Sequence, residues 1–212
     1  VEKYENQKNV FDLVEKWLER TPFLETDDFS FWGSYEKSIH KMLENDISII
    51  KKNTQIDNAA KNEQIDNYKK IYNDFELLLN EKKYEDSMQK GYRSLSQKAT
   101  LAALFIMLYR HEPILQSPYR LITKLIDIDQ SLNVWRYNHA LLAQRMIGTK
   151  IGSGGSSGFK YLSKTLEKHS IFGEYANLST YLIPKSDMPK LPNDLINKLG
   201  YHFTGQEKKN EQ

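Results

Sequence analysis

The sequence predicts an all-α protein, and three observations support that expectation. Apolar residues recur at helical spacing along most of the chain. The signals of strands, such as sustained alternation and Asn-Gly turns, are nearly absent. The most apolar run, Leu101 to Tyr109 ("LAALFIMLY"), is about half as long as a bilayer-spanning helix and suits a buried one. With 212 residues, we expect one ordinary domain or one domain with extended arms.

The composition excludes several classes of function. Thirty basic and 28 acidic side chains give a net charge of +2, which provides no broad electrostatic footprint for nucleic acid or an anionic membrane. The absence of cysteine excludes disulfides and thiolate metal sites. The first residues, "VEKYENQKNV", carry charges of both signs and do not form a signal peptide. We expect a cytoplasmic protein without nucleic-acid or membrane partners.

The spacing of apolar residues predicts two amphipathic helices in the N-terminal part of the chain. The first has one apolar stripe and ends near Thr21-Pro22, because proline disfavours helical geometry in the residue before it. Asp28 or Ser30 caps the second. The apolar stripes consist of Val10, Phe11, Val14, Trp17 and Leu18 in the first helix and of Trp32, Tyr35, Ile39, Met42 and Leu43 in the second.

Residues 51–67 ("KKNTQIDNAAKNEQIDN") are polar on all sides, so composition leaves open a solvated helical arm or a mobile segment. An apolar stripe returns from Tyr68 to Leu79. Ser94 or Ser96 then caps the helix that contains "LAALFIMLY". Because that helix is apolar around most of its circumference, we expect it to run through the core.

A long helix should follow, with Ser117 as N-cap, Pro118 in the first turn and Gly148 as the stop signal. It would be about 45 Å long. Residues spaced alternately three and four positions apart lie on one face of a helix, and we expect this face to be a buried packing seam. Its members are Leu121, Leu125, Ile128, Leu132, Trp135, His139, Leu142 and Met146. We expect a later helix over residues 171–183, ending before Pro184. We expect residues 203–212 to form a disordered tail.

His139 is the polar member of an otherwise apolar seam. It suits either a core histidine hydrogen-bonded to a carbonyl or carboxylate, or a ligand of haem iron or another metal. Leu142 and Ala143 occupy the positions three and four residues later, which argues against a multi-ligand metal site on this helix. A single axial ligand remains compatible with the pattern.

The run "GSGGSSG", Gly152 to Gly158, is a second unusual feature. A nucleotide-binding loop is excluded, since no Lys-Ser or Lys-Thr follows the last glycine and no strand precedes the run. Its composition fits a flexible linker, but glycines also allow close approach of the backbone to a ligand. Periodicity does not decide between these two interpretations.

Several motifs together resemble the tryptophan 2,3-dioxygenase family, particularly its animal members. They occur in the family's order and cover almost the whole chain: "WLERTPFL", "FSFWG", "GYRSLS", "LITKLIDIDQSL", "WRYNHALLAQRMIG", "GSGGSSGFKYL" and "NLSTYLIP". The resemblance implies a helical bundle of the tryptophan/indoleamine dioxygenase type with a long haem-ligand helix. It also implies a homotetramer with haem b that opens the indole ring of L-tryptophan with O2 to give N-formylkynurenine, the first step of tryptophan catabolism.

The resemblance also assigns residues. By the motif "RYNH", His139 is the axial ligand of haem iron, and Ser153, where the family has threonine, helps to hold the ammonium of substrate tryptophan. The motif "WLERTP" implies a second tryptophan site with Trp17, Arg20 and Pro22. The alternative is that Trp17 is a core residue and Arg20 a surface one.

The family's distal histidine and carboxylate-binding arginine find no match here, so no catalytic residue is assigned. We expect residues 1–212 to be the C-terminal part of one haem dioxygenase domain. The distal pocket would need an N-terminal segment, in the same or a separate chain. The alternative function is a non-catalytic helical assembly module that retains the fold.

Overall fold

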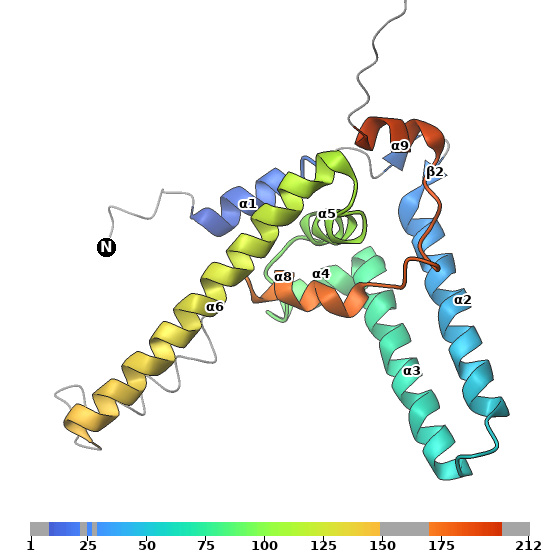
Figure 1. The fold of residues 1–212 in the computed structure, drawn as a ribbon, viewed down its shortest axis with the longest axis horizontal. Coiled ribbons are helices and arrows are strands. Elements are labelled where there is room, and N and C mark those ends of the chain that lie inside the picture. The colour runs from blue at the N-terminus through green and yellow to red at the C-terminus, as the bar shows by residue number, and fades with distance from the viewer. Residues whose placement is uncertain (1–8, 22–24, 27–28, 149–169, 201–212) are drawn as a thin grey trace, which may run out of the picture.

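The computed structural model describes residues 9–21, 25–26, 29–148 and 170–200. Within these ranges it is almost entirely helical, as predicted (Figure 1). The elements are α1 (Val10–Leu18), β1 (Glu25–Thr26), β2 (Phe29–Ser30), α2 (Phe31–Lys52), α3 (Asn58–Leu79), α4 (Glu81–Gln89), α5 (Gln97–Leu108), α6 (Pro113–Ile147), α8 (Gly173–Asn177), the 3-10 helix η2 (Leu178–Tyr181) and α9 (Asn193–Leu199). The two short strands pair antiparallel. None of the described helices is long and apolar enough to cross a membrane.

Helix α5 forms the centre of the fold, which confirms the prediction that this apolar helix runs through the core (Figure 1). Its N-cap is Ser96, whose hydroxyl accepts a hydrogen bond from the Ala99 amide. The Ser96 hydroxyl donates to Glu19 Oε1 at 2.6 Å, and the Ser96 amide donates to Glu15 Oε1 at 2.7 Å. Two carboxylates of α1 thus lie at the positive end of α5, where the helix dipole favours them, and fix α1 to the core.

Helices α2 and α3 form an antiparallel hairpin that extends from the core (Figure 1). Ser30 caps α2 by accepting from the Gly33 amide, and Asp57 caps α3 by accepting from the Ala60 amide. Residues 51–67 occupy the tip of this hairpin. Tyr35, Ile39 and Leu43 of α2 are buried, together with Phe75 and Leu78 of α3, so the hairpin is anchored at its base.

Two of the quoted motifs meet in one polar cluster, together with Tyr35, Tyr84 and Glu174. The Arg93 guanidinium of "GYRSLS" donates to the Tyr181 hydroxyl of "NLSTYLIP" at 2.9 Å and lies over the Tyr84 ring. The Tyr35 hydroxyl, just after "FSFWG", donates to the Tyr181 carbonyl. Both Glu174 carboxylate oxygens accept from backbone amides of residues 94 and 95. In the described chain, these motif residues hold the fold together.

Helix α6 begins earlier than predicted. Its first residue is Pro113 and its N-cap is Glu112, so the predicted N-cap at Ser117 is wrong and Pro118 lies inside the helix. Pro113 satisfies the same preference for proline in the first turn, and the buried Leu115 anchors that turn. The helix ends at Gly148, which has φ of 66°, as the predicted stop signal requires.

The predicted single helix over residues 171–183 is also wrong. The segment contains the short helix α8 and the 3-10 helix η2. Its apolar residues at helical spacing, Phe172, Tyr175 and Leu178, are buried as expected. Because a 3-10 turn places every third side chain on one face, the same spacing suits either helix type.

Candidate functional site

The predicted seam lies on one face of α6, but its predicted burial is wrong along most of its length. Leu125 is buried, whereas the members from Ile128 onward are largely exposed in the described chain. Their exposed fractions are 53% for Ile128, 37% for Leu132, 62% for Trp135, 53% for Leu142 and 77% for Met146. We call these five residues together with His139 the α6 stripe. Figure 1 shows the physical reason: the C-terminal half of α6 extends beyond the other labelled helices.

The α6 stripe is far more apolar than an exposed helix face usually is. A contiguous row of large apolar side chains on a water-facing surface marks a site for a ligand or another polypeptide. The composition of the row therefore requires a covering group, although the described helices do not supply one. In the same half of α6 the buried residues of the described chain are Asp129 and Ala140, each one position after a member of the predicted seam, so the face that the chain buries is displaced by one residue from the predicted one.

His139 lies in the middle of the α6 stripe, and its imidazole is exposed. Its ring stacks on the Trp135 indole, one turn earlier, with centroids 5.4 Å apart and planes 8° from parallel. The four-residue spacing places both side chains on the same side of the helix. The indole thus restricts the ring orientation of His139 while leaving its edge accessible. Sequence reasoning placed both residues on one face but did not foresee this stacking.

Asp129 fixes the base of the site-bearing half of α6. Its carboxylate is 4% exposed and accepts hydrogen bonds from the Ser170 hydroxyl and from the Ile171 amide at 2.9 Å. Leu125 and Ile122, one and two turns earlier, are buried in the core. This carboxylate belongs to the motif "LIDIDQSL", whose role the sequence alone did not reveal. The orientation of the α6 stripe is therefore set by a buried carboxylate close to the site.

The donor set of the α6 stripe fits haem better than a bare metal ion. Among the described residues, no group of three or more His, Asp or Glu side chains could hold a metal ion. One imidazole surrounded by aromatic and aliphatic side chains is what an axially ligated macrocycle needs, because the iron takes one protein ligand and the ring buries apolar surface. The residues present thus fit the group that the resemblance implies.

The chain is similar to known proteins over most of its length. The family model described as tryptophan 2,3-dioxygenase matches residues 1–182. The chain belongs to the tryptophan 2,3-dioxygenase family. It is 44% identical over 198 residues to the tryptophan 2,3-dioxygenase of Bdellovibrio bacteriovorus, covering 93% of this chain and 55% of that protein. It is 44% identical over 200 residues to the Mus musculus enzyme, covering 94% of this chain and 48% of that protein. The chain thus spans about half the length of the curated relatives it matches.

The other predicted site residues of this family member are placed only in part. Ser153 and the rest of the glycine-serine loop lie outside the described residues, as does Pro22. Trp17 is half-buried and packs against the core. Arg20 is exposed, and its Nε donates to the Lys16 carbonyl oxygen at 3.1 Å. Trp17 has the partial burial expected of either a core residue or a site wall, so the second tryptophan site remains a prediction.

Proposed function

We propose that this chain is the haem-binding part of a dioxygenase that opens the indole ring of L-tryptophan with O2 to give N-formylkynurenine. The observation that carries the proposal is the accessible imidazole of His139 on the apolar α6 stripe, in a chain that belongs to the tryptophan 2,3-dioxygenase family. A solvent-facing imidazole alone would have many roles. Its position within a row of large apolar side chains supports the binding of a flat apolar cofactor.

In this proposal His139 would hold the haem iron through one nitrogen of its imidazole. Haem b, when bound, supplies the redox iron that the reaction with O2 needs. Trp135 limits rotation of the imidazole by stacking on it. Leu132, Leu142 and Met146 exclude water around the ligand, because they present only apolar atoms along the same face of the helix.

The remaining contacts are proposed from the family. Ser153 holds the substrate ammonium through its hydroxyl and backbone. We also propose, from the same resemblance, that the distal groups come from an N-terminal part, in the same or a separate polypeptide, and that turnover requires it. We further propose a cytoplasmic homotetramer as the working assembly.

The experiment is an absorption titration of the purified chain with haemin, comparing His139→Ala with His111→Ala. His111 is an exposed histidine just before α6, at the opposite end of that helix from His139, so it controls for nonspecific coordination. We expect a Soret band in the wild type and in His111→Ala, and its loss in His139→Ala. Adding imidazole to His139→Gly should restore the band. A band that survives in His139→Ala would contradict the ligand assignment.

A non-catalytic assembly module is the second candidate, and the exposure of the α6 stripe is the observation that favours it. Such a module would use the same apolar row to bind a polypeptide. Mixing the chain with the N-terminal half of a relative, haem, O2 and L-tryptophan separates the two functions. Formation of N-formylkynurenine supports the enzyme. A stable complex that binds no haem and forms no product supports the module.

A further inference from the structure

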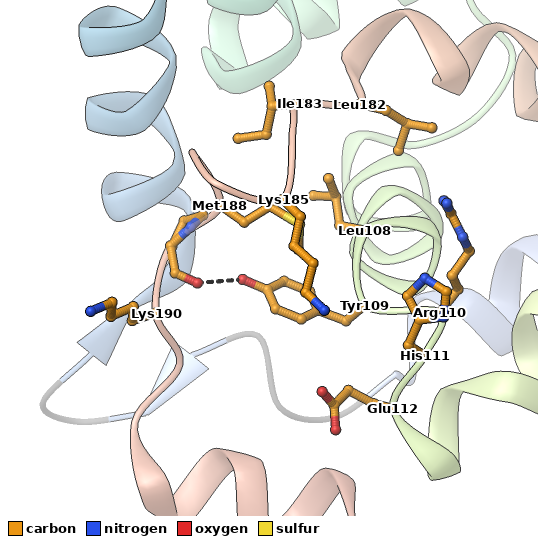
Figure 2. Close-up of a pocket in the computed structure, with 11 residues that line it drawn as sticks. Leu108, Tyr109, Arg110, His111, Glu112, Leu182, Ile183, Lys185, Met188 and Lys190 are labelled. Carbon is orange, nitrogen blue, oxygen red and sulfur yellow. Dashed lines mark hydrogen bonds between the residues drawn. The ribbon is translucent and has the colours of Figure 1, made fainter.

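A cavity of about 350 Å³ lies at the junction of α5, α6 and the chain segment that follows η2. One wall is Leu108 to Glu112, and the other consists of Leu182, Ile183, Lys185 and Met188 to Lys190 (Figure 2). Its volume is within the range of about 300–1,000 Å³ that small-molecule sites occupy. Glu112 is the N-cap of α6, so the 27 helical residues to His139 place this cavity about 40 Å from that histidine.

The cavity has a rigid wall. The Tyr109 hydroxyl donates to the Pro189 carbonyl oxygen at 2.7 Å, a bond drawn in Figure 2, and so joins the two segments that line the cavity. The Tyr109 ring is 9% exposed and packs edge-to-face on Phe31. Burial, with a smaller effect of Glu112, raises the pKa of Tyr109, so the phenol remains a neutral donor across the physiological range. The hydrogen bond and the ring contact together hold this wall of the cavity in place.

The interior and the rim differ in chemistry. Leu108 and Ile183 are buried, and the half-buried Leu182 and Met188 add further apolar surface. In Figure 2, Ile183, Leu182 and Leu108 occupy the upper part of the view and the charged side chains lie below and beside them. The lining thus offers an apolar surface next to a polar rim.

The rim carries three cations and one carboxylate: Arg110, Lys185, Lys190 and Glu112. The Arg110 guanidinium is half-buried, donates to the Met107 carbonyl and lies 5.8 Å from the Tyr119 ring centroid, so its position is restricted. Lys185 and Lys190 are exposed, and neither forms an ion pair with a residue that the structure describes. The rim therefore has two ammonium groups available for an anion.

We propose that this cavity binds a small organic monoanion with an apolar body, such as an aryl-alkyl carboxylate. The apolar body occupies the surface formed by Leu108, Ile183 and Met188, while the carboxylate reaches the ammonium group of Lys185 beside the Tyr109 ring, with Lys190 adding positive charge at the rim. An inorganic anion would leave the apolar surface unused, and a neutral apolar molecule would gain no attraction from the positively charged rim. Charge and hydrophobicity together select the class of ligand.

The experiment is a titration of the whole chain with 4-phenylbutyrate, followed by calorimetry and by amide chemical shifts. Neutral 4-phenylbutanamide and inorganic phosphate are tested in parallel. The variant Lys185→Gln/Lys190→Gln is compared with Lys41→Gln/Lys198→Gln, which removes the same charge from exposed lysines that do not line the cavity. All four lysines are exposed, so folding should not be affected.

We expect 4-phenylbutyrate to shift amides of residues 108–112 and 182–190, and to bind about tenfold more weakly to the cavity variant while the control variant changes less than about twofold. His139→Ala should leave this binding unchanged, which separates it from the haem proposal. Equal binding of the amide and the acid, full competition by phosphate, or shifts confined to the α6 stripe would each overturn the proposal.

Discussion

Two buried tyrosines, one hydrogen-bonded through its hydroxyl and one not, allow the contribution of a buried hydrogen bond to stability to be measured. The same substitution, tyrosine to phenylalanine, is made at each position and the two changes in the free energy of unfolding are compared. Tyr84 and Tyr175 are each 0% exposed. The Tyr84 hydroxyl donates to the Leu95 carbonyl oxygen at 3.1 Å and shares a second hydrogen bond with the Thr100 hydroxyl at 2.6 Å. The Tyr175 hydroxyl has no hydrogen-bond partner among the described residues. Substitution by phenylalanine removes only the hydroxyl, so the burial of each ring is preserved.

The expected free energies of unfolding differ in magnitude and sign. Tyr84→Phe leaves the Leu95 carbonyl and the Thr100 hydroxyl without their partner, which should cost about 1–3 kcal/mol. Tyr175→Phe removes a buried polar atom that gains nothing in return, so we expect a change between zero and about 1 kcal/mol of stabilisation. Burial raises the pKa of both phenols, so both are neutral at pH 7 and ionisation does not affect the comparison.

The assay is equilibrium urea denaturation at pH 7, followed by far-UV circular dichroism. The midpoint for Tyr84→Phe should fall and that for Tyr175→Phe should hold or rise, with unchanged slopes. If Tyr175→Phe destabilises the chain as much as Tyr84→Phe does, the Tyr175 hydroxyl has a partner in solution. The reasoning from its isolation would then be refuted.

Three further substitutions test local features by the same assay. Ser96→Ala should cost about 1–2 kcal/mol, because it removes the N-cap of α5 and the hydroxyl bound to Glu19; an unchanged midpoint would contradict this. Gly91→Ala should cost about 1 kcal/mol, since φ is 73° and no atom crowds an added Cβ, whereas Gly91→Asn should cost less; equal losses would point to a steric cause instead. Asp129→Ala should lower the free energy of unfolding by about 2–4 kcal/mol, because it removes a buried acceptor. The control Asp127→Ala, which removes only a solvent-accessible ion pair, should lower it by less than about 0.5 kcal/mol. Similar losses in the two variants would refute the anchoring role of Asp129.

Helix positions were predictable where local rules decide them. Ser30 and Ser96 are N-caps, and Gly148 ends α6, because capping depends on a few adjacent residues. The start of α6 was misplaced because two prolines, Pro113 and Pro118, both suit a first turn and only tertiary packing selects between them. The polar cluster around Tyr181 joins residues up to 146 positions apart, and no local rule predicts such pairs.

The sequence predicted which apolar residues share a face of α6 with His139, but it predicted wrongly that this face is buried. The apolar spacing around His139 identified one face of α6, and the family resemblance gave that face a chemical meaning. Spacing reports only that a face avoids water, not which group covers it, so His139 was expected inside the chain and is exposed instead. The four-residue separation of Trp135 and His139 predicts that their side chains lie on the same side of the helix, but the stacking of the two rings is seen only in the structure.

The projection of α6 beyond the core divides the residues of this chain into two sets with separate tasks. Substitutions at Trp135, His139 or Met146 remove little that the described fold depends on, so their effects on ligand binding can be measured without correction for unfolding. Substitutions in α5 should act in the opposite way, changing the population of folded molecules while leaving the affinity of each one intact. The same division would let the binding face vary during evolution without loss of the scaffold that carries it.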